Sequence, residues 1–213
     1  TKFYTNVLRM GSNILYRGYV NGQQVKKRIQ FKPNLYIVGD TPSDWKTLDG
    51  QSVVECQMDS MSDATDFLKR YADVYNFEVY GNNNYCAQYL AQEFPDNISF
   101  DRELVRVLNI DIEVASDAGF PEPKDAAHPI ISIAIRKNDG NYWVWGLNDY
   151  TPTREDVLFI KCDNEIDLIR KFVDHFQHYA PDVITGWNTR FFDIPYIINR
   201  CVKLFGDDTL LKR

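Results

Sequence analysis

The chain has 213 residues, of which 44% are hydrophobic and 14% aromatic, and its formal net charge is −6. This apolar content suffices for one large or two modest packed domains and excludes an intrinsically disordered chain. No apolar stretch approaches the roughly 20 residues that span a bilayer, and no signal peptide opens the sequence. We therefore expect a soluble intracellular protein without a membrane partner.

The four cysteines lie far apart, at positions 56, 86, 162 and 201, and form neither a CxxC pair nor a compact framework. This spacing favours free thiols in a reducing compartment, because disulfide-rich and zinc-binding chains place their cysteines in recurring close pairs. The cysteines therefore do not support a zinc site.

Positive charge is concentrated at the start of the chain. Residues 1–32 contain seven lysine or arginine residues and no acid, and aromatic residues are interleaved with them. Phosphates attract cations and nucleobases stack on aromatic rings, so this segment is a candidate nucleic-acid surface that includes Lys26, Lys27 and Arg28. The alternative is a hairpin whose solvent-facing side is basic for no functional reason.

The elements predicted for the first hundred residues begin with strands. Asn21-Gly22 separates two extended runs and predicts a β-hairpin within residues 12–31. Residues 60–75 predict an amphipathic helix that Ser60 or Ser62 caps, and a second short helix is predicted over residues 85–94. The apolar face of the first helix comprises Ala64, Phe67, Leu68, Tyr71, Val74 and Tyr75.

A new pattern begins near residue 104, and we place a domain boundary at about residue 103. Extended segments are predicted over residues 104–115, 128–147 (a hairpin turning at Asp139-Gly140), 157–162 and 182–187. Helices are predicted over residues 164–180 and 192–206, the second with Pro195 in its first turn. Strands followed by alternating strand and helix predict a mixed α/β layer on one sheet.

The helix predicted over residues 164–180 is amphipathic. We expect His175 and His178 to project from its polar side and to be solvated. The side chains expected to point inward are Ile166, Ile169, Val173, Phe176 and Ala180.

The predicted strand at residues 104–115 carries two acids, Asp111 and Glu113, among isoleucine and valine residues. Alternate residues of a strand share a face, so both carboxylates point to one side and the apolar side chains to the other. Hard divalent cations prefer carboxylate oxygens, which makes the pair half of a candidate metal site. A strand with one solvated face presents the same pattern, and a third acid is needed to decide between these interpretations.

Asp193 is the candidate third acid. It stands where the last predicted strand passes to a helix, a common position for functional groups in α/β folds. An acid at a helix N-terminus also interacts favourably with the helix dipole, and Asn188 just before it is equally typical of a turn. Each residue therefore keeps a structural alternative when it is considered alone.

Taken together, these motifs resemble family B DNA polymerases, and closely the replicative polymerases of large tailed bacteriophages. DIE at 111–113 resembles the family's first exonuclease motif, and GWNTRFFDIPYI at 186–197 resembles its second. FYTNVLRMGSNI at 3–14 and GFPEP at 119–123 also resemble the phage branch. The resemblance extends over essentially the whole chain.

This resemblance implies that residues 104–213 contain most of a 3'-5' proofreading exonuclease domain with an RNase H-like α/β fold. Residues 1–103 would be a smaller β-rich amino-terminal domain that helps to hold template and in some relatives binds RNA. The third exonuclease motif, the polymerisation site and the sliding-clamp contact are expected in the rest of the polymerase chain, beyond this sequence. We therefore expect a largely inactive N-terminal fragment of a replicative DNA polymerase, located in the host cytoplasm if the source is a phage.

The resemblance also implies a chemistry with two Mg²⁺ or Mn²⁺ ions, acting on the single-stranded 3' end of primer–template DNA. Asp111 would bridge the ions, Glu113 would bind the ion that carries the attacking water, and Asp193 would serve the second ion. Asn188 would contact phosphate or support the ligands, and Phe120 would stack on a frayed primer end. The alternative for Phe120 is an aromatic residue that anchors its loop.

Two further interpretations stay open. The chain could be a free-standing metal-dependent 3'-5' exonuclease, which would need its last acid within the sequence. It could also be an RNA- or DNA-binding module without catalysis, acting through the basic segment, and its nucleic-acid affinity would then survive loss of Asp111.

Overall fold

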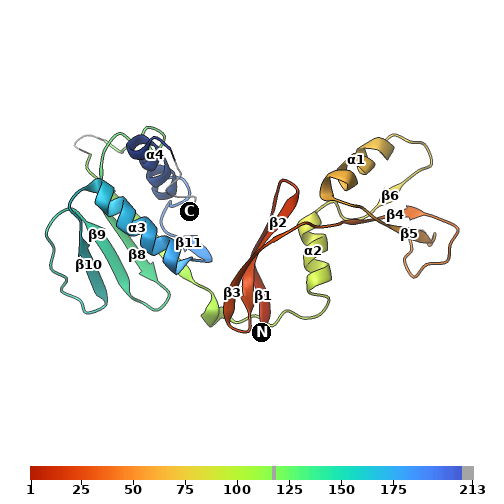
Figure 1. The fold of residues 1–213 in the computed structure, drawn as a ribbon, viewed down its shortest axis with the longest axis horizontal. Helices are drawn as coiled ribbons and strands as arrows, with labels where there is room; N and C mark the ends of the chain where they lie inside the picture. The colour runs from red at the N-terminus through yellow and green to blue at the C-terminus, as the bar shows by residue number, and fades with distance from the viewer. Residues whose placement is uncertain (117–118, 208–213) are drawn as a thin grey trace. The chain divides into compact units, whose positions relative to one another are not determined.

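The computed structural model of the protein describes residues 1–116 and 119–207 (Figure 1). Its contacts divide the chain into two compact units, Thr1–Leu104 and Val105–Arg213. Within the described residues, no helix is both long enough and apolar enough to cross a membrane.

The first unit begins with a three-stranded antiparallel sheet, in which β2 (Asn13–Val20) lies between β1 (Lys2–Met10) and β3 (Gln23–Ile29). Asn21 and Gly22 connect β2 to β3 with φ angles of 50° and 79°. Two successive residues with positive φ form a turn that matches the twist of a hairpin, and an Asn-Gly pair adopts this conformation readily. The predicted hairpin is confirmed.

A second antiparallel sheet follows in the order β5-β4-β6, built from β4 (Asn34–Val38), β5 (Val53–Gln57) and β6 (Val79–Tyr80). Figure 1 shows α1 (Met61–Tyr71) beside this sheet, and α2 (Tyr85–Glu93) follows β6 in the chain. Residues from both sheets and both helices share one core. Its buried members are Ile14, Tyr16, Phe31, Leu35, Met61, Ala64, Tyr85 and Tyr89.

The helix α1 begins at a predicted N-cap, because the Ser60 hydroxyl accepts a hydrogen bond from the backbone N–H of Asp63 at 3.1 Å. It ends at Tyr71, so Val74 and Tyr75 lie beyond it and are 46% and 98% exposed. The prediction that these two side chains belong to the apolar face of the helix is wrong. The helical spacing of apolar residues continues in the sequence to Tyr75, but the helix itself ends four residues earlier.

The second unit contains a five-stranded sheet in the order β10-β9-β8-β7-β11. The antiparallel strands β7, β8 and β9 form its centre, while β10 pairs in parallel with β9 and β11 in parallel with β7. The predicted strands and the mixed sheet are confirmed. The strand bounds are Val107–Val114 (β7), Ile130–Lys137 (β8), Tyr142–Gly146 (β9), Val157–Lys161 (β10) and Val183–Thr185 (β11).

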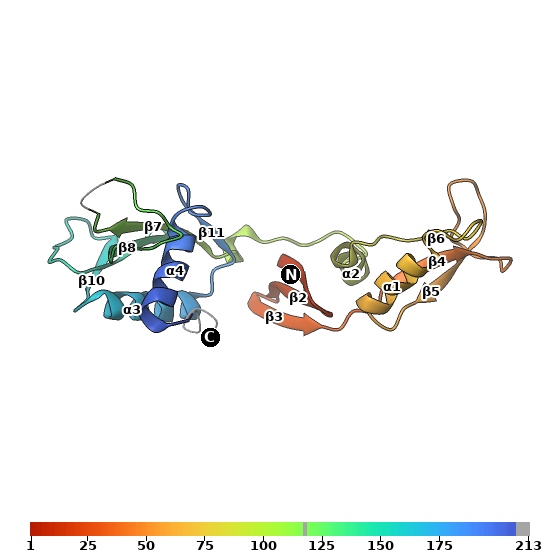
Figure 2. The same cartoon turned by 90° about the horizontal axis from the view of Figure 1, so that it is seen from above.

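Two helices, α3 (Glu165–Tyr179) and α4 (Asp193–Phe205), cover one face of this sheet, and Figure 2 shows both on the same side of β7 and β8. Isoleucines of β7 and β8 pack against the buried side chains of the helices in a single core. Among the described residues of this unit, no helix covers the opposite face. One face of the sheet is therefore open, and β7 contributes side chains to it.

The helix α3 packs on the sheet through Leu168, Ile169, Phe172 and Val173, all of which are buried. Ile166 is 39% exposed, so the prediction that it points inward is wrong. Ile166 lies at the edge of the stripe that these four residues form, close to the position of Val173, but in the first turn of the helix, which the sheet covers less than the later turns.

His175 also differs from expectation, because its ring is packed and not solvated. The ring centroid lies 4.2 Å from that of Trp143 and 5.3 Å from that of Trp145. Its Nε2 atom is buried and has no hydrogen-bond partner in the described part of the chain. Burial, together with the nearby positive charge of Lys137, lowers the pKa of His175 to about 4.

This burial predicts a specific pH dependence of stability. In the unfolded chain a histidine binds its proton near its ordinary pKa of 6.5, whereas folded His175 resists protonation until about pH 4. Unfolding therefore takes up a proton in this window, and the free energy of unfolding should fall as the pH is lowered through it. His175→Phe should make the free energy of unfolding less dependent on pH between about pH 6.5 and about pH 4, as measured by urea denaturation.

Phe176→Leu on the same helix offers a control, because it removes apolar contacts without changing a titratable group. It should lower the free energy of unfolding by a similar amount across this pH window. If His175→Phe showed the same pH dependence as the unmodified chain, the buried histidine would not contribute to acid destabilisation.

Candidate active site

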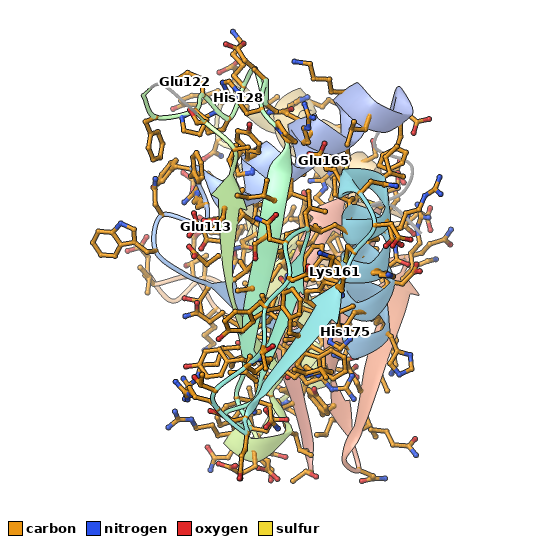
Figure 3. All side chains as sticks on the ribbon, turned by 90° about the vertical axis from the view of Figure 1, so that its left-hand side faces the viewer. Glu113, Glu122, His128, Lys161, Glu165 and His175 are labelled. Carbon is orange, nitrogen blue, oxygen red and sulfur yellow. The ribbon has the colours of Figure 1, made fainter. Side chains whose placement is uncertain are left out.

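The strand β7 presents its polar side chains on the open face of the sheet. Asp111 and Glu113 are exposed there, whereas Ile110 and Ile112 are only 1% and 6% exposed. Figure 3 shows Glu113 on the side of the sheet opposite to His175 of α3. The strand alternation thus places both carboxylates on one face, as their spacing predicts.

Asp193 approaches the same strand from the first turn of α4. Its side chain is 2% exposed, and its Oδ1 atom accepts a hydrogen bond from the backbone N–H of Ile112 at 3.1 Å. Ile112 is the residue between Asp111 and Glu113. The Oδ2 atom of Asp193 is buried and has no hydrogen-bond partner in the part of the chain that the structure describes.

Burial raises the pKa of the Asp193 carboxyl group. The hydrogen bond from Ile112 and the neighbouring Thr189 hydroxyl group act in the opposite direction, and the negative charge of Asp111 adds to the rise. Asp111 and Asp193 are therefore electrostatic neighbours, although they come from different elements. Two neighbouring carboxylates, one with an oxygen that lacks a partner, form a place where a cation is favoured.

The donor set that the structure brings together is Asp111 with Asp193. Across residues 1–116 and 119–207, no three Asp, Glu, His or Cys side chains form a group that could hold a metal ion. The unpartnered Asp193 oxygen and the oxygen-only chemistry nevertheless fit a hard divalent ion such as Mg²⁺ or Mn²⁺, which coordinates a few carboxylates and otherwise water.

Glu113 lines a different feature of the open face. Together with Ser132 of β8, it borders a cavity of about 430 Å³ whose wall includes Tyr142, Tyr150 and Phe159. The open face is thus hollow and aromatic on the side of Glu113 that leads towards β9 and β10. This shape can receive a flat or apolar group next to a carboxylate.

The turn between β11 and α4 determines where Asp193 lies. Asn188 has a φ of 58°, and its carbonyl oxygen accepts hydrogen bonds from the N–H groups of Phe191 and Phe192, each at 2.9 Å. Asparagine tolerates this left-handed conformation better than most residues, which explains its place in the turn. Its side chain is exposed.

Gly186 lets this turn press directly against β7. Its φ is 158°, and a Cβ atom at this position would lie 2.1 Å from Thr189 Oγ1 and 2.4 Å from the backbone oxygen of Ile110. No side chain fits in this space. Since Ile110 directly precedes Asp111, the absence of a side chain at Gly186 keeps the start of α4 close to the acidic strand.

Three exposed aromatic residues lie in the turn before α4 or in a segment that contacts the start of that helix. Phe120 is 72% exposed, and its ring centroid lies 4.7 Å from that of Phe192. Trp187 and Phe191 in the turn before α4 are 91% and 71% exposed. Our sequence reasoning did not select these two residues, and the signal that could have found them is two aromatic residues close together in a polar turn directly before Asp193.

A buried ion pair holds α4 in place and was also missed. Arg200 donates to Glu165 of α3 through Nε at 2.8 Å and through Nη2 at 2.7 Å. Its Nη1 atom donates to the backbone oxygens of Ala126 and Ala127 at 3.1 and 3.2 Å. The sequence signal was an arginine two helical turns after Asp193, on the same face of a helix that otherwise buries apolar residues.

A mixed five-stranded sheet with helices on one face and carboxylates on an inner strand defines an RNase H-like α/β domain. The family model for the exonuclease domain of DNA polymerase family B matches residues 65–210. The chain therefore belongs to DNA polymerase family B and carries the exonuclease region of that family.

The similar proteins include phage polymerases. The DNA-directed DNA polymerase of Escherichia phage RB69 is 29% identical over 238 residues, covering 98% of this chain and 26% of the relative. The DNA-directed DNA polymerase of Enterobacteria phage T4 is 28% identical over 237 residues, with the same coverage. This chain thus spans about a quarter of the length of the phage polymerases that it matches.

Among solved structures, the family B DNA polymerase from the hyperthermophilic archaeon Pyrobaculum calidifontis matches with a TM-score of 0.61 and 18% sequence identity. The match covers 95% of this chain and 32% of the archaeal chain. At this level of identity the similarity establishes the fold. It confirms the predicted α/β fold class of the second unit.

The tight contact at Gly186 predicts a stability loss. Gly186→Ala should lower the free energy of unfolding by about 1–3 kcal/mol, because the new methyl group meets Thr189 and the backbone of β7. Gly140→Ala is the control, since Gly140 has a φ of 94° but a methyl group there would meet no atom within 4 Å. Both variants introduce backbone strain, but only Gly186→Ala also introduces a steric clash, so urea denaturation should show the larger loss of stability for Gly186→Ala. Equal losses of stability would contradict the close packing at Gly186.

Proposed function

We propose that this chain forms part of a DNA-directed DNA polymerase used in DNA replication and that its second unit supplies carboxylates for 3'-5' exonucleolytic proofreading. The observation that carries the proposal is the hydrogen bond from Ile112 to Asp193, which brings a buried carboxylate next to Asp111. Membership of DNA polymerase family B supports it, as does the similarity to phage polymerases over almost the whole chain.

In this proposal Asp111 and Asp193 hold a divalent ion, Mg²⁺ or Mn²⁺, and Glu113 serves a second ion from the same strand. Bound ions of this kind activate water and stabilise the leaving oxygen in phosphodiester hydrolysis. The protein's own contribution is orientation. The Ile112 N–H holds one oxygen of Asp193 in place, and the buried isoleucines of β7 keep the strand that carries Asp111 rigid.

The exposed aromatic residues suit the single-stranded 3' end that such a reaction needs. Phe120, Trp187 and Phe191 offer ring faces on which unpaired bases can stack, whatever their sequence. Asn188, exposed in the same turn as Trp187 and Phe191, is our candidate for a contact to phosphate. The partners proposed for the second unit are therefore primer–template DNA and its frayed primer end.

A second proposed function, nucleic-acid binding by the first unit, rests on the basic residues of β2 and β3. The pairing of Lys26 with Arg17, together with strand alternation, places Arg17, Lys26 and Arg28 on one side of the sheet, which we call the basic face. Lys27 pairs with the buried Tyr16, and its Nζ atom lies 5.9 Å from the ring of that tyrosine on the other side. The basic run in the sequence is thus divided between two faces.

The first test of the proposed site is metal binding. Asp193→Asn keeps an oxygen that can accept the hydrogen bond from Ile112 but loses the charge, and Asp111→Asn removes the neighbouring charge. Each variant should bind Mn²⁺ at least about tenfold more weakly than the unmodified chain in calorimetric titration. Glu155→Gln removes one exposed charge elsewhere in the second unit and should leave Mn²⁺ binding unchanged.

Other outcomes of this titration would favour other functions. If Asp111→Asn and Asp193→Asn bound Mn²⁺ as well as the unmodified chain, the candidate metal site would be wrong. Nucleic-acid affinity that survived both changes and did not respond to Mn²⁺ would then favour a binding module without catalysis. Any hydrolysis of 5'-labelled single-stranded DNA should shorten the strand from its 3' end and be lost in Asp111→Asn.

The second test concerns the basic face. The double change Lys26→Gln and Arg28→Gln should weaken binding of single-stranded DNA or RNA and reduce the dependence of the affinity on salt, since fewer counterions are released. Lys27→Gln should have a smaller effect than either single change on the basic face, because Lys27 lies on the other side of the sheet. Fluorescence anisotropy across a salt series measures both quantities, and an unchanged salt slope in the double variant would count against the basic face.

A further inference from the structure

The second part of the first unit has a charge opposite to that of its beginning. Residues 33–101 contain twelve acidic and three basic side chains, a formal net charge of −9. Between residues 33 and 68 the only basic side chain is Lys46. Such a surface repels phosphate groups, so this part of the unit is unsuited to binding nucleic acid and suited to binding a cation.

A cavity of about 560 Å³ lies beside β5 within this acidic part. Asp44, Trp45 and Glu55 line it, and the tryptophan is 61% exposed. Among the described residues, neither of these acids takes part in an ion pair. An exposed indole ring that shares a cavity with two carboxylates lacking ion pairs is a candidate interaction site, and the Glu55 carboxylate is held there by a hydrogen bond from Asn34 Nδ2.

Two tyrosines of the β5-β4-β6 sheet lie on the same face as Glu55. Tyr36 of β4 pairs with Glu55 of β5 on one side and with Tyr80 of β6 on the other, so the three side chains share one face. The rings of Tyr36 and Trp45 lie 5.9 Å apart. We call Tyr36, Asp44, Trp45, Glu55 and Tyr80 the acid–aromatic face.

Backbone hydrogen bonds hold the loop that carries Trp45. The N–H of Val53 at the start of β5 donates to the backbone oxygen of Trp45 at 3.1 Å, and the N–H of Gly39 donates to the oxygen of Ser52 at 3.2 Å. Lys46 and Ser52 form an isolated antiparallel bridge. The cavity is therefore formed before any ligand arrives, which lowers the entropic cost of binding.

We propose that the acid–aromatic face binds an arginine side chain in a basic segment of a partner protein. A guanidinium group can stack on the Trp45 ring while its N–H groups donate to the carboxylates of Asp44 and Glu55. A nucleic acid would bring phosphates towards these acids, and a purely apolar ligand would leave their charges uncompensated. The charge and the exposed ring together select a planar cation.

The test uses the whole 213-residue chain and a fluorescein-labelled peptide of arginine, glycine and serine, measured by anisotropy. The double change Asp44→Asn and Glu55→Gln should weaken peptide binding by about tenfold, and Trp45→Ala by about fivefold. Neither change removes the backbone bond from Val53 to residue 45. A peptide with glutamate in place of arginine should not bind.

The matched control removes the same charge elsewhere in the unit. Asp66 on α1 and Asp73 after it are exposed and line no part of the cavity, so Asp66→Asn with Asp73→Asn should change binding by less than about twofold. An equal loss in this control would show that only the overall charge matters and would overturn the proposal. It would also be overturned if the arginine peptide failed to bind the unmodified chain, or if single-stranded nucleic acid bound there in a way that Trp45→Ala weakened.

Discussion

The arrangement of the second unit depends on the buried ion pair between Arg200 and Glu165, whose side chains are each 11% exposed. Loss of one partner from such a pair costs about 3–5 kcal/mol, because the other charge is left buried without compensation. Glu165 also accepts a hydrogen bond from the N–H of Ile130 at the start of β8, and Arg200 holds the carbonyl groups of the segment before it. The pair thus fastens α3, α4 and the entry to β8 together.

The position of Asp193 follows from that constraint. It lies two turns before Arg200 on the same face of α4, so the helix that the ion pair fixes also directs Asp193 towards β7. The hydrogen bond from Ile112 and the close approach at Gly186 complete the placement from the strand side. Asp193 is therefore held, buried, next to Asp111. Burial of a carboxylate and the repulsion between two negative charges both disfavour this arrangement, and the packing of the rest of the domain stabilises it.

The first unit separates its charges in space as well as along the chain. Residues 1–32 are basic, and the acid–aromatic face lies in the segment that follows, although both belong to one packed core. This separation lets one unit attract phosphate on one surface and a cation on another. The two proposed contacts would then operate without competing for the same side chains. Because of strand alternation, Lys27 lies on the opposite side of the sheet from Lys26 and Arg28.

The sequence by itself determined the features that arise from neighbouring residues. The Asn21-Gly22 turn, a serine cap at one of two positions before α1 and the shared face of Asp111 and Glu113 follow from local backbone geometry and were predicted, and the structure selects Ser60 as the cap. Only the tertiary structure decided which residues of α3 are buried, that His175 packs against two tryptophans of β9, and that Asp193 accepts a hydrogen bond from Ile112, 81 residues away in the chain. Those outcomes depend on contacts between elements, and the packing of a helix against a sheet selects among several faces that its sequence pattern leaves open.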